Sequence, residues 1–314
     1  MKAAEAEGSP GSPASAGDAG GSRDAHAAAF SDFPAPLGPL GKGETLSLER
    51  LDDGTFTGYC HGGRAAHRAY GGAVVAQALA AACRTVDEDR PVHSLHAYFL
   101  RALDSRRPVR FASRVLRDGR SYSARQVEAT QEGHHALTMT VSFKERQPTA
   151  NWRHPEMPDL PGPDGLEDGF AHRPATHPLR QAVEFREIPP VLDPGQPEIE
   201  RFGWFRTVGA LPDGPAAHAG AVAYLCDATL APTALVPHEP TSFERGRPSR
   251  HTIASLDHAM WFHRPFRADR WLLYAQRSRV EGDGRTLAYG EFWSPEGELA
   301  VSVIQEALLH VREP

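Results

Sequence analysis

Three polar side chains stand in apolar stretches of the second half of the chain, where polar groups are unexpected. Gln305 shares its alternating face with Leu, Val and Ala residues, Asp227 lies in an Ala- and Leu-rich run, and Ser255 is flanked by Ile, Ala and Leu. Because side chains alternate along a strand, the Gln305 amide should point into the core. An unpaired buried amide costs roughly 1–3 kcal/mol, so it should have partners. We therefore expect the carboxylate, the hydroxyl and the amide to meet in one active site.

The chemistry open to such a group is the activation of water. A carboxylate accepts the proton of an attacking water, and general base catalysis of this kind is worth typically ~10²–10⁴ in rate. The hydroxyl of Ser255 and the amide of Gln305 would fix the orientation of that water. Neither a metal nor a cofactor is needed for this chemistry, and we expect none.

Sequence motifs of other enzyme classes are missing. The run Gly-Arg-Ser-Tyr-Ser at 119–123 lacks the last glycine of a serine-hydrolase G-x-S-x-G. The chain has no H-E-x-x-H, no P-loop and no Rossmann glycine pattern. His258 and His263 are five residues apart in a strand-like run, so they should face opposite sides, which disfavours a metal site.

The composition is that of a globular protein, with 40% hydrophobic and 24% charged residues in 314. The net charge of -6, without a basic block, argues against nucleic acid as a partner. No apolar run reaches the ~18 residues that a membrane span needs, and no apolar run before Phe30 resembles a signal peptide. The three cysteines form no C-x-x-C pair, which favours reduced thiols and a cytoplasmic location.

The chain divides by composition into four parts. Residues 1–40 are rich in Ala, Gly, Ser and Pro and are expected to be a disordered tail. Residues 41–147 and 198–314 carry alternating and helical patterns and are predicted to be two domains. Between them, residues 148–197 hold 11 of the 27 prolines and are predicted to be a linker with one short strand at 182–186.

The two predicted domains share one order of elements, a helix of small residues followed by antiparallel strands. The helices are predicted at 73–83 and at about 218–235, where Pro232 should kink or end the second helix. Strand patterns also occur at 45–51, 54–59 and 202–208. The predicted strands that follow the helices are 92–100, 109–117, 121–129 and 136–143 in the first half, and 253–262, 271–280, 286–293 and 300–309 in the second.

Local sequence matches indicate that the halves arose by duplication of a unit of about 100 residues. Asp-Gly-Arg-Ser at 118–121 corresponds to Asp-Gly-Arg-Thr at 283–286, and Glu-Gly turns at 132–133 and 296–297 correspond as well. In this register Gln305 falls opposite Val141, within one residue. One half therefore keeps an apolar residue where the other has an amide, as expected for a double domain with a single site.

Longer runs resemble the acyl-CoA thioesterase II family. Tyr-Gly-Gly-Ala-Val-Val-Ala-Gln-Ala-Leu at 70–79, His-Ser-Leu-His-Ala-Tyr-Phe-Leu-Arg at 93–101 and the run 116–125 resemble its first half. Leu-Asp-His-Ala-Met-Trp-Phe-His-Arg-Pro-Phe at 256–266 and Val-Ile-Gln-Glu-Ala at 303–307 resemble its second half. The resemblance extends over about 44–312, apart from much of the predicted linker.

The resemblance implies an α+β double hotdog fold, in which each half is a long helix wrapped by an antiparallel sheet. It implies hydrolysis of fatty acyl-CoA thioesters, with catalytic residues that fall on Asp227, Ser255 and Gln305. Ser255 stands where a threonine is expected, and the family's Gly-Gly-Gln is Gly-Gly-Ala at 71–73. The run after Asp227, Ala-Thr-Leu-Ala, is less aromatic than expected, which affects the shape of the pocket.

Several alternatives stay open at this stage. The chain could bind acyl-CoA or another lipid without hydrolysing it, or it could act on thioesters of acyl carrier protein. A homo-oligomer, a dimer or larger, is expected from the resemblance. Tyr98, Trp261, Phe262, Trp271 and Trp293 could line an acyl tunnel, although packing of sheet on helix explains each of them equally well. The candidates for contact with the CoA phosphates are Arg101, Arg106, Arg107 and Arg264.

Overall fold

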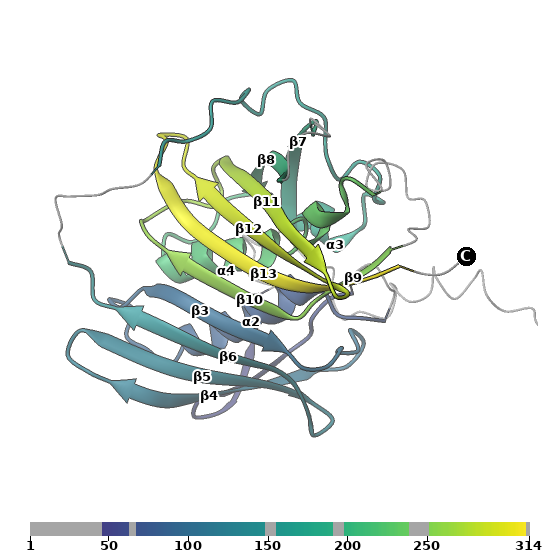
Figure 1. The fold of residues 1–314 in the computed structure, drawn as a ribbon. Helices are drawn as coiled ribbons and strands as arrows, with labels where there is room; N and C mark the ends of the chain where they lie inside the picture. The colour runs from purple at the N-terminus through teal and green to yellow at the C-terminus, as the bar shows by residue number, and fades with distance from the viewer. Residues whose placement is uncertain (1–45, 63–66, 148–154, 191–197, 239–250, 312–314) are drawn as a thin grey trace, which may run out of the picture. The chain divides into compact units, whose positions relative to one another are not determined.

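The computed structural model describes residues 46–62, 67–147, 155–190, 198–238 and 251–311. The predicted tail and part of the predicted linker lie outside these residues. Within them, the strands form one antiparallel sheet with the helices packed on one side, as Figure 1 shows. The order of the paired strands is β1-β2-β4-β5-β6-β3-β10-β13-β12-β11-β8-β7, and β9 pairs with β13.

The first half places one helix, α2, against its strands. Ten of the 13 residues of α2 are buried, which agrees with its run of Ala and Val. The predicted turn at Glu132 and Gly133 is present, and both residues have positive φ, as a two-residue hairpin turn requires. The elements of this half are β1 (Glu49–Asp52), β2 (Thr55–Gly58), α2 (Gly71–Cys83), β3 (Val92–Phe99), β4 (Val109–Asp118), β5 (Tyr122–Gln131) and β6 (His134–Lys144).

The second half repeats this plan with additions at its start. The predicted short strand at 182–186 is the edge strand β7, and the expected strand 253–262 is interrupted at Leu256. The elements are α3 (Pro178–Ala182), β7 (Val183–Ile188), β8 (Ile199–Thr207), α4 (Pro215–Cys226), the 3-10 helix η2 (Ala231–Leu235), β9 (His251–Ser255), β10 (Asp257–Phe262), β11 (Leu272–Gly282), β12 (Arg285–Trp293) and β13 (Leu299–Val311).

The second predicted helix is shorter than expected. Helix α4 ends at Cys226, and Asp227 is its C-cap residue, so the prediction of one helix to residue 235 was wrong. Pro232 lies in the first turn of η2, where its missing N–H is tolerated. The physical reason for the early end is tertiary. Asp227 bonds to the start of α2, and a further helical turn would carry its carboxylate away from that partner.

The halves meet along β3 and β10 and along the two long helices. In the sheet, Ala97 lies opposite His258 and Leu95 opposite Met260, and all four side chains are buried. A Cβ added to Gly72 of α2 would lie 2.3 Å from the carbonyl oxygen of Tyr224 in α4. Glycine at this position therefore permits the backbones of the two helices to touch. The arrangement is the double hotdog that the resemblance implies.

The structure gives the duplication a residue-level register. Gly133 and Gly297 have φ values of 81° and 79°, and the eighth residue after each is Val141 and Gln305 respectively, both fully buried. The strand pairing agrees, since Val92 pairs with Phe143 in one half and Ser255 pairs with Ala307 in the other. Val92 and Ser255 are therefore equivalent positions, as are Val141 and Gln305.

The proline-rich segment is more than a connection. Met157, Leu160 and Leu166 pack against Trp204 and Trp293 in a second apolar cluster, separate from the main core. The Trp204 Nε1–H donates a hydrogen bond of 2.8 Å to the Pro161 carbonyl. The segment thus covers one part of the second-half sheet. The domain boundaries at 147 and 197 stay a prediction.

Candidate active site

The structure brings Asp227, Ser255 and Gln305 together. The Ser255 hydroxyl donates to Asp227 Oδ1 at 2.9 Å, and the Gln305 Nε2–H donates to the same oxygen at 2.6 Å. The second carboxylate oxygen, Oδ2, accepts the backbone N–H of Gly72 at 2.9 Å. Hydrogen bonds to a charged acceptor are stronger than those between neutral groups, so three donors fix this carboxylate firmly.

Each of the three side chains is placed by a different element. Asp227 follows the last residue of α4, Ser255 ends β9, and Gln305 lies in the middle of β13. The break at Leu256 is stabilised by the Leu256 N–H, which donates to the Glu306 carbonyl at 2.9 Å. Because Ser255 and Gln305 belong to neighbouring strands, both side chains reach the carboxylate from the sheet.

The electrostatics of the helix ends explain why the first half is needed. The C-terminal end of a helix carries partial negative charge, which disfavours a carboxylate such as Asp227 there. The N-terminal end of α2 carries partial positive charge, and its Gly72 N–H faces this carboxylate. The site is thus formed at the contact between the two halves.

Gly71 keeps the space above the carboxylate open. A Cβ on Gly71 would lie 2.8 Å from Asp227 Oδ2 and 3.3 Å from the Phe99 ring. The absence of a side chain at this residue therefore leaves room for a reacting group next to Asp227. Ala73, which replaces the expected glutamine, is fully buried in α2.

Gln305 offers a further clue in its second amide atom. The Gln305 side chain is fully buried, and its Oε1 has no hydrogen-bond partner among the described residues. A buried acceptor without a partner is rare and asks for an explanation. A water held between this oxygen and the Asp227 carboxylate would satisfy it.

A second polar network lies beside the site and was not found from the sequence. The Tyr70 hydroxyl donates to the Tyr224 carbonyl at 2.6 Å, and the Tyr224 hydroxyl lies 2.5 Å from His61 Nε2. His61 Nδ1 lies 3.1 Å from the Gly62 carbonyl, so Nδ1 carries the proton and Nε2 accepts from Tyr224. Burial lowers the pKa of His61 to about 4, which keeps it neutral. These partners are up to 163 residues apart, and no local pattern announces them.

Cys226 and His258 form another buried contact next to Asp227. Cys226 Sγ lies 3.1 Å from His258 Nε2, and both side chains are buried. Burial raises the pKa of the Cys226 thiol well above its usual range, and the Asp227 charge acts in the same direction. Burial also lowers the pKa of His258. The thiol and the imidazole are therefore a neutral pair and not a nucleophile with its base. The prediction that His258 and His263 face apart holds, since His263 is exposed and contacts Ser302.

The candidate arginines do not form one group. Arg106 and Arg107 form ion pairs with Asp104, and Arg107 also pairs with Glu132. Arg264 pairs with Glu298. Arg101 follows β3, close in sequence to Phe99 of the site, and forms no ion pair among the described residues.

The aromatic residues that could line a tunnel are mostly used in packing. Tyr98 is 59% exposed, and the Trp261 ring packs edge-on against His96. Trp271 and Trp293 belong to the second apolar cluster. Phe262 lines a separate cavity, which is described below.

Comparison with known proteins gives the family. A model of the acyl-CoA thioesterase N-terminal domain matches residues 61–144, and a model of the acyl-CoA thioesterase C-terminal domain matches residues 152–309. The chain is 36% identical over 287 residues to human acyl-coenzyme A thioesterase 8, which covers 85% of this chain and 88% of the relative. The chain belongs to the acyl-CoA thioesterase II family.

Solved structures support this assignment. A crystal structure of the acyl-CoA thioesterase II TesB2 from Mycobacterium marinum is 36% identical, covers 87% of this chain and 99% of its own, and superposes with a TM-score of 0.72. A hot dog protein of unknown function from Alicyclobacillus acidocaldarius is 22% identical, covers 86% and 98%, and has a TM-score of 0.70. The second likeness concerns the fold alone. Both the family and the double hotdog fold expected from the sequence are confirmed.

The family's C-terminal model begins inside the predicted linker, at residue 152. This start agrees with the packing of Met157 and Leu160 on the second-half sheet. In the part of the chain that the structure describes, no helix is both long and apolar enough to cross a membrane.

Proposed function

We propose that the protein hydrolyses acyl-CoA thioesters to a free acid and CoA, with Asp227 as the general base. The observation that carries the proposal is the set of three donors on the Asp227 carboxylate together with the unpartnered Oε1 of Gln305. Membership of the acyl-CoA thioesterase II family and the 36% identity to human acyl-coenzyme A thioesterase 8 support the substrate class.

In the proposed reaction, one water lies between Asp227 and Gln305 Oε1. Asp227 takes a proton from it while its oxygen attacks the thioester carbon. The C–S bond then breaks, the acid is released, and the thiolate of CoA is protonated to the free thiol. Ser255 and the Gln305 amide hold the carboxylate so that its free lone pairs face the water.

The developing oxyanion needs a donor, and the start of α2 supplies a candidate. Gly72 N–H is used by Asp227, and Ala73 N–H bonds to the Tyr70 carbonyl. The Gly71 N–H has no hydrogen-bond partner among the described residues. We assign it to the thioester oxygen, because it lies in the first turn of a helix and has open space around it.

The deciding experiment is release of free thiol from acyl-CoAs of short, medium and long chain. Wild type should release thiol, and Asp227→Asn should reduce kcat by ~10² or more, since the amide cannot act as a base. Asp257→Asn is the matched control. Asp257 accepts the Glu306 N–H at 2.6 Å, and an asparagine oxygen can accept it too, so its rate should stay within a few-fold of wild type.

The outcomes separate the alternatives. Equal rates in wild type and Asp227→Asn would remove Asp227 from the mechanism. Binding of acyl-CoA without thiol release by wild type would indicate a binding protein. Release only from acyl carrier protein thioesters would change the substrate class.

We also propose that the protein works in the cytoplasm as a homo-oligomer. The three cysteines are free, as expected in a reducing compartment, although buried thiols would persist elsewhere too. Light scattering of the purified chain tests the oligomer, and a monomer would contradict it. Fractionation of cells that produce the protein tests the location.

A further inference from the structure

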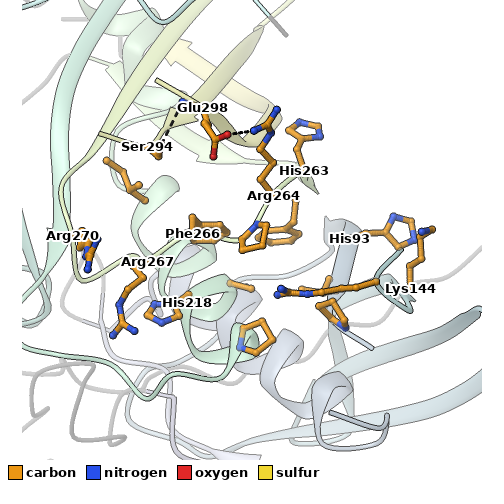
Figure 2. A pocket seen from close by; sticks show the side chains of 18 of the residues that line it. His93, Lys144, His218, His263, Arg264, Phe266, Arg267, Arg270, Ser294 and Glu298 are labelled. Atoms are coloured by element: carbon orange, nitrogen blue, oxygen red, sulfur yellow. Dashed lines mark hydrogen bonds and ion pairs between the residues drawn. The ribbon is translucent and has the colours of Figure 1, made fainter. Parts of the chain in front are cut away.

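A cavity of about 630 Å³ lies at the far end of α4 from Asp227. It opens between the start of β3, the end of β6, the start of α4, the end of β10 and the turn before β13 (Figure 2). Because α4 has 12 residues at 1.5 Å each, its start lies about 18 Å from the candidate active site. We call this space the counterpart cavity.

The counterpart cavity occupies the place that corresponds to the active site in the other half. The active site uses the start of α2, the end of β3, Ser255 before β10, and β13. The cavity uses the start of α4, the end of β10, the start of β3, and β6. Val92, the equivalent of Ser255, lines it, and so does Phe262, which ends β10 as Phe99 ends β3.

The groups that would activate water are missing from this second place. The residue that caps α2 is Arg84, where α4 is capped by Asp227. Val92 replaces Ser255, and Val141 replaces Gln305. Pro215 at the start of α4 has no N–H to offer. The space has thus been kept while the catalytic groups have not.

Cations face the cavity without carboxylate partners. Arg264 is paired with Glu298, and Arg267 with Asp213 and Asp269. Lys144, Arg146 and Arg270, which also line the cavity, form no ion pair among the described residues. The lining carboxylates outside ion pairs are Glu145 and Glu296.

The remaining lining groups are neutral or apolar. Burial lowers the pKa of the three lining histidines, so they carry little charge at pH 7; they are His93, His218 and His263. The rings of Phe262 and Phe266 are parallel, with an interplanar angle of 7° and centroids 6.4 Å apart. In Figure 2, Phe266 lies in the middle of the lining, with Lys144 and Arg270 on opposite sides. Flat apolar walls between cations suit a ligand with both phosphates and apolar parts.

We propose that the counterpart cavity binds CoA or acyl-CoA without hydrolysing it. The ligand class rests on the proposed function, because the cavity is the duplicate of the place where that function puts the thioester. Lys144 and Arg270 attract the phosphates, and the Phe262 and Phe266 rings contact the apolar part of the ligand. The chain then carries one hydrolytic and one non-hydrolytic site for the same class of molecule.

Isothermal titration of the full chain with CoA, and with a thioether analogue of acyl-CoA that cannot be hydrolysed, tests the proposal. Wild type should bind two equivalents per chain. The double variant Lys144→Glu/Arg270→Glu should weaken one of the two sites at least tenfold. Phe266→Ala should weaken the same site without a change of charge. Arg114→Glu/Arg117→Glu reverses two exposed charges on β4, away from the cavity, and is the matched control.

The source of the recognition is tested with fragments. 3′-Phospho-ADP should bind this site more weakly than CoA, because it lacks the pantetheine arm. Equal binding of the two would show a nucleotide site and overturn the assignment to acyl-CoA. Circular dichroism of each variant confirms that it is folded.

Thiol release by the same preparations separates this inference from the proposed function. Hydrolysis by wild type with a single binding site that neither cavity variant changes would overturn the counterpart site alone. Binding that is sensitive to Lys144→Glu/Arg270→Glu in a protein that hydrolyses no acyl-CoA would overturn the function alone. Absence of both hydrolysis and binding would overturn both.

Discussion

The Asp227 carboxylate joins segments that are far apart in the chain. Its partners Gly72, Ser255 and Gln305 lie 155, 28 and 78 residues away. A partly buried carboxylate must be hydrogen-bonded, since desolvation of an unpaired charge is expensive. The same donors that stabilise it also fix the direction of its free lone pairs. Positioning of the base and stability of the fold are therefore linked at this residue.

Ser255 should matter through its hydroxyl alone. Ser255→Ala removes one hydrogen bond to a charged group, worth about 1.5–3 kcal/mol, so kcat/KM should fall roughly 10- to 100-fold if the loss appears in the transition state. Ser255→Thr keeps the hydroxyl and should stay within a few-fold of wild type. Steady-state thiol release measures both variants. A Thr variant as slow as the Ala variant would show that space, and not the hydroxyl, limits this position.

At the scale of elements, the contact between α2 and α4 depends on two adjacent glycines with different roles. A Cβ on Gly72 would meet backbone, the Tyr224 carbonyl, at 2.3 Å, whereas a Cβ on Gly71 would meet the Asp227 side chain. Gly72→Ala should therefore separate the helices and lower both the unfolding temperature and the activity. Gly71→Ala should remove most activity with a smaller loss of stability.

Thermal unfolding and thiol release, measured together, distinguish the two effects. Gly214→Ala is the control, because a Cβ there would meet nothing within 4 Å. It should leave activity near wild type and change stability by no more than about 1 kcal/mol. Equal losses of stability in Gly71→Ala and Gly72→Ala would contradict the separation of roles.

The cover formed by the proline-rich segment should be worth measurable stability. Trp204→Phe removes the hydrogen bond to the Pro161 carbonyl and part of a buried ring, so the free energy of unfolding should fall by about 1–3 kcal/mol. Trp261→Phe, on a ring that is only partly buried, should cost less. Urea unfolding measures both. No difference between them would show that the segment contributes little.

Much of this architecture could be predicted because it is recorded locally. Alternation placed the strands within a few residues, turn glycines placed the hairpins, and an amide on an apolar face identified Gln305. The end of α4 at Cys226 could not be predicted, since the sequence continues with helix-compatible residues and the end is set by the contact of Asp227 with Gly72. The Tyr224–His61 pair and the packing of Met157 also depend on distant partners. Local patterns carry no information about such contacts.

For the whole molecule, the two places related by duplication have diverged in chemistry more than in shape. Asp227, Ser255 and Gln305 stand at one place, and Arg84, Val92 and Val141 at the other. The helices and the sheet are shared, so a change that serves one place is transmitted to the other through α2 and α4. This sharing explains why the first half, which has no catalytic carboxylate of its own, still supplies Gly71 and Gly72 to the site.

Stability of the whole fold should fall on mild acidification. Burial lowers the pKa of His61 from 6.5 to about 4, so between these values the unfolded chain binds the proton and the folded chain does not. The stability that this histidine contributes is therefore complete above pH 6.5 and is lost as the pH falls towards 4. At pH 5 the loss from His61 alone should be about 2 kcal/mol.

Urea unfolding of wild type and His61→Gln at pH 7 and pH 5 checks this effect. Glutamine offers Tyr224 an acceptor without titrating, so its loss between the two pH values should be smaller than that of wild type. Some loss should remain, because burial also lowers the pKa of His177 to about 4. Asp104, whose pKa is lowered to about 2 chiefly by the Arg106 hydrogen bond, loses its contribution only below its unfolded value of 3.8. An equal loss in wild type and His61→Gln would place the acid sensitivity outside the active-site network.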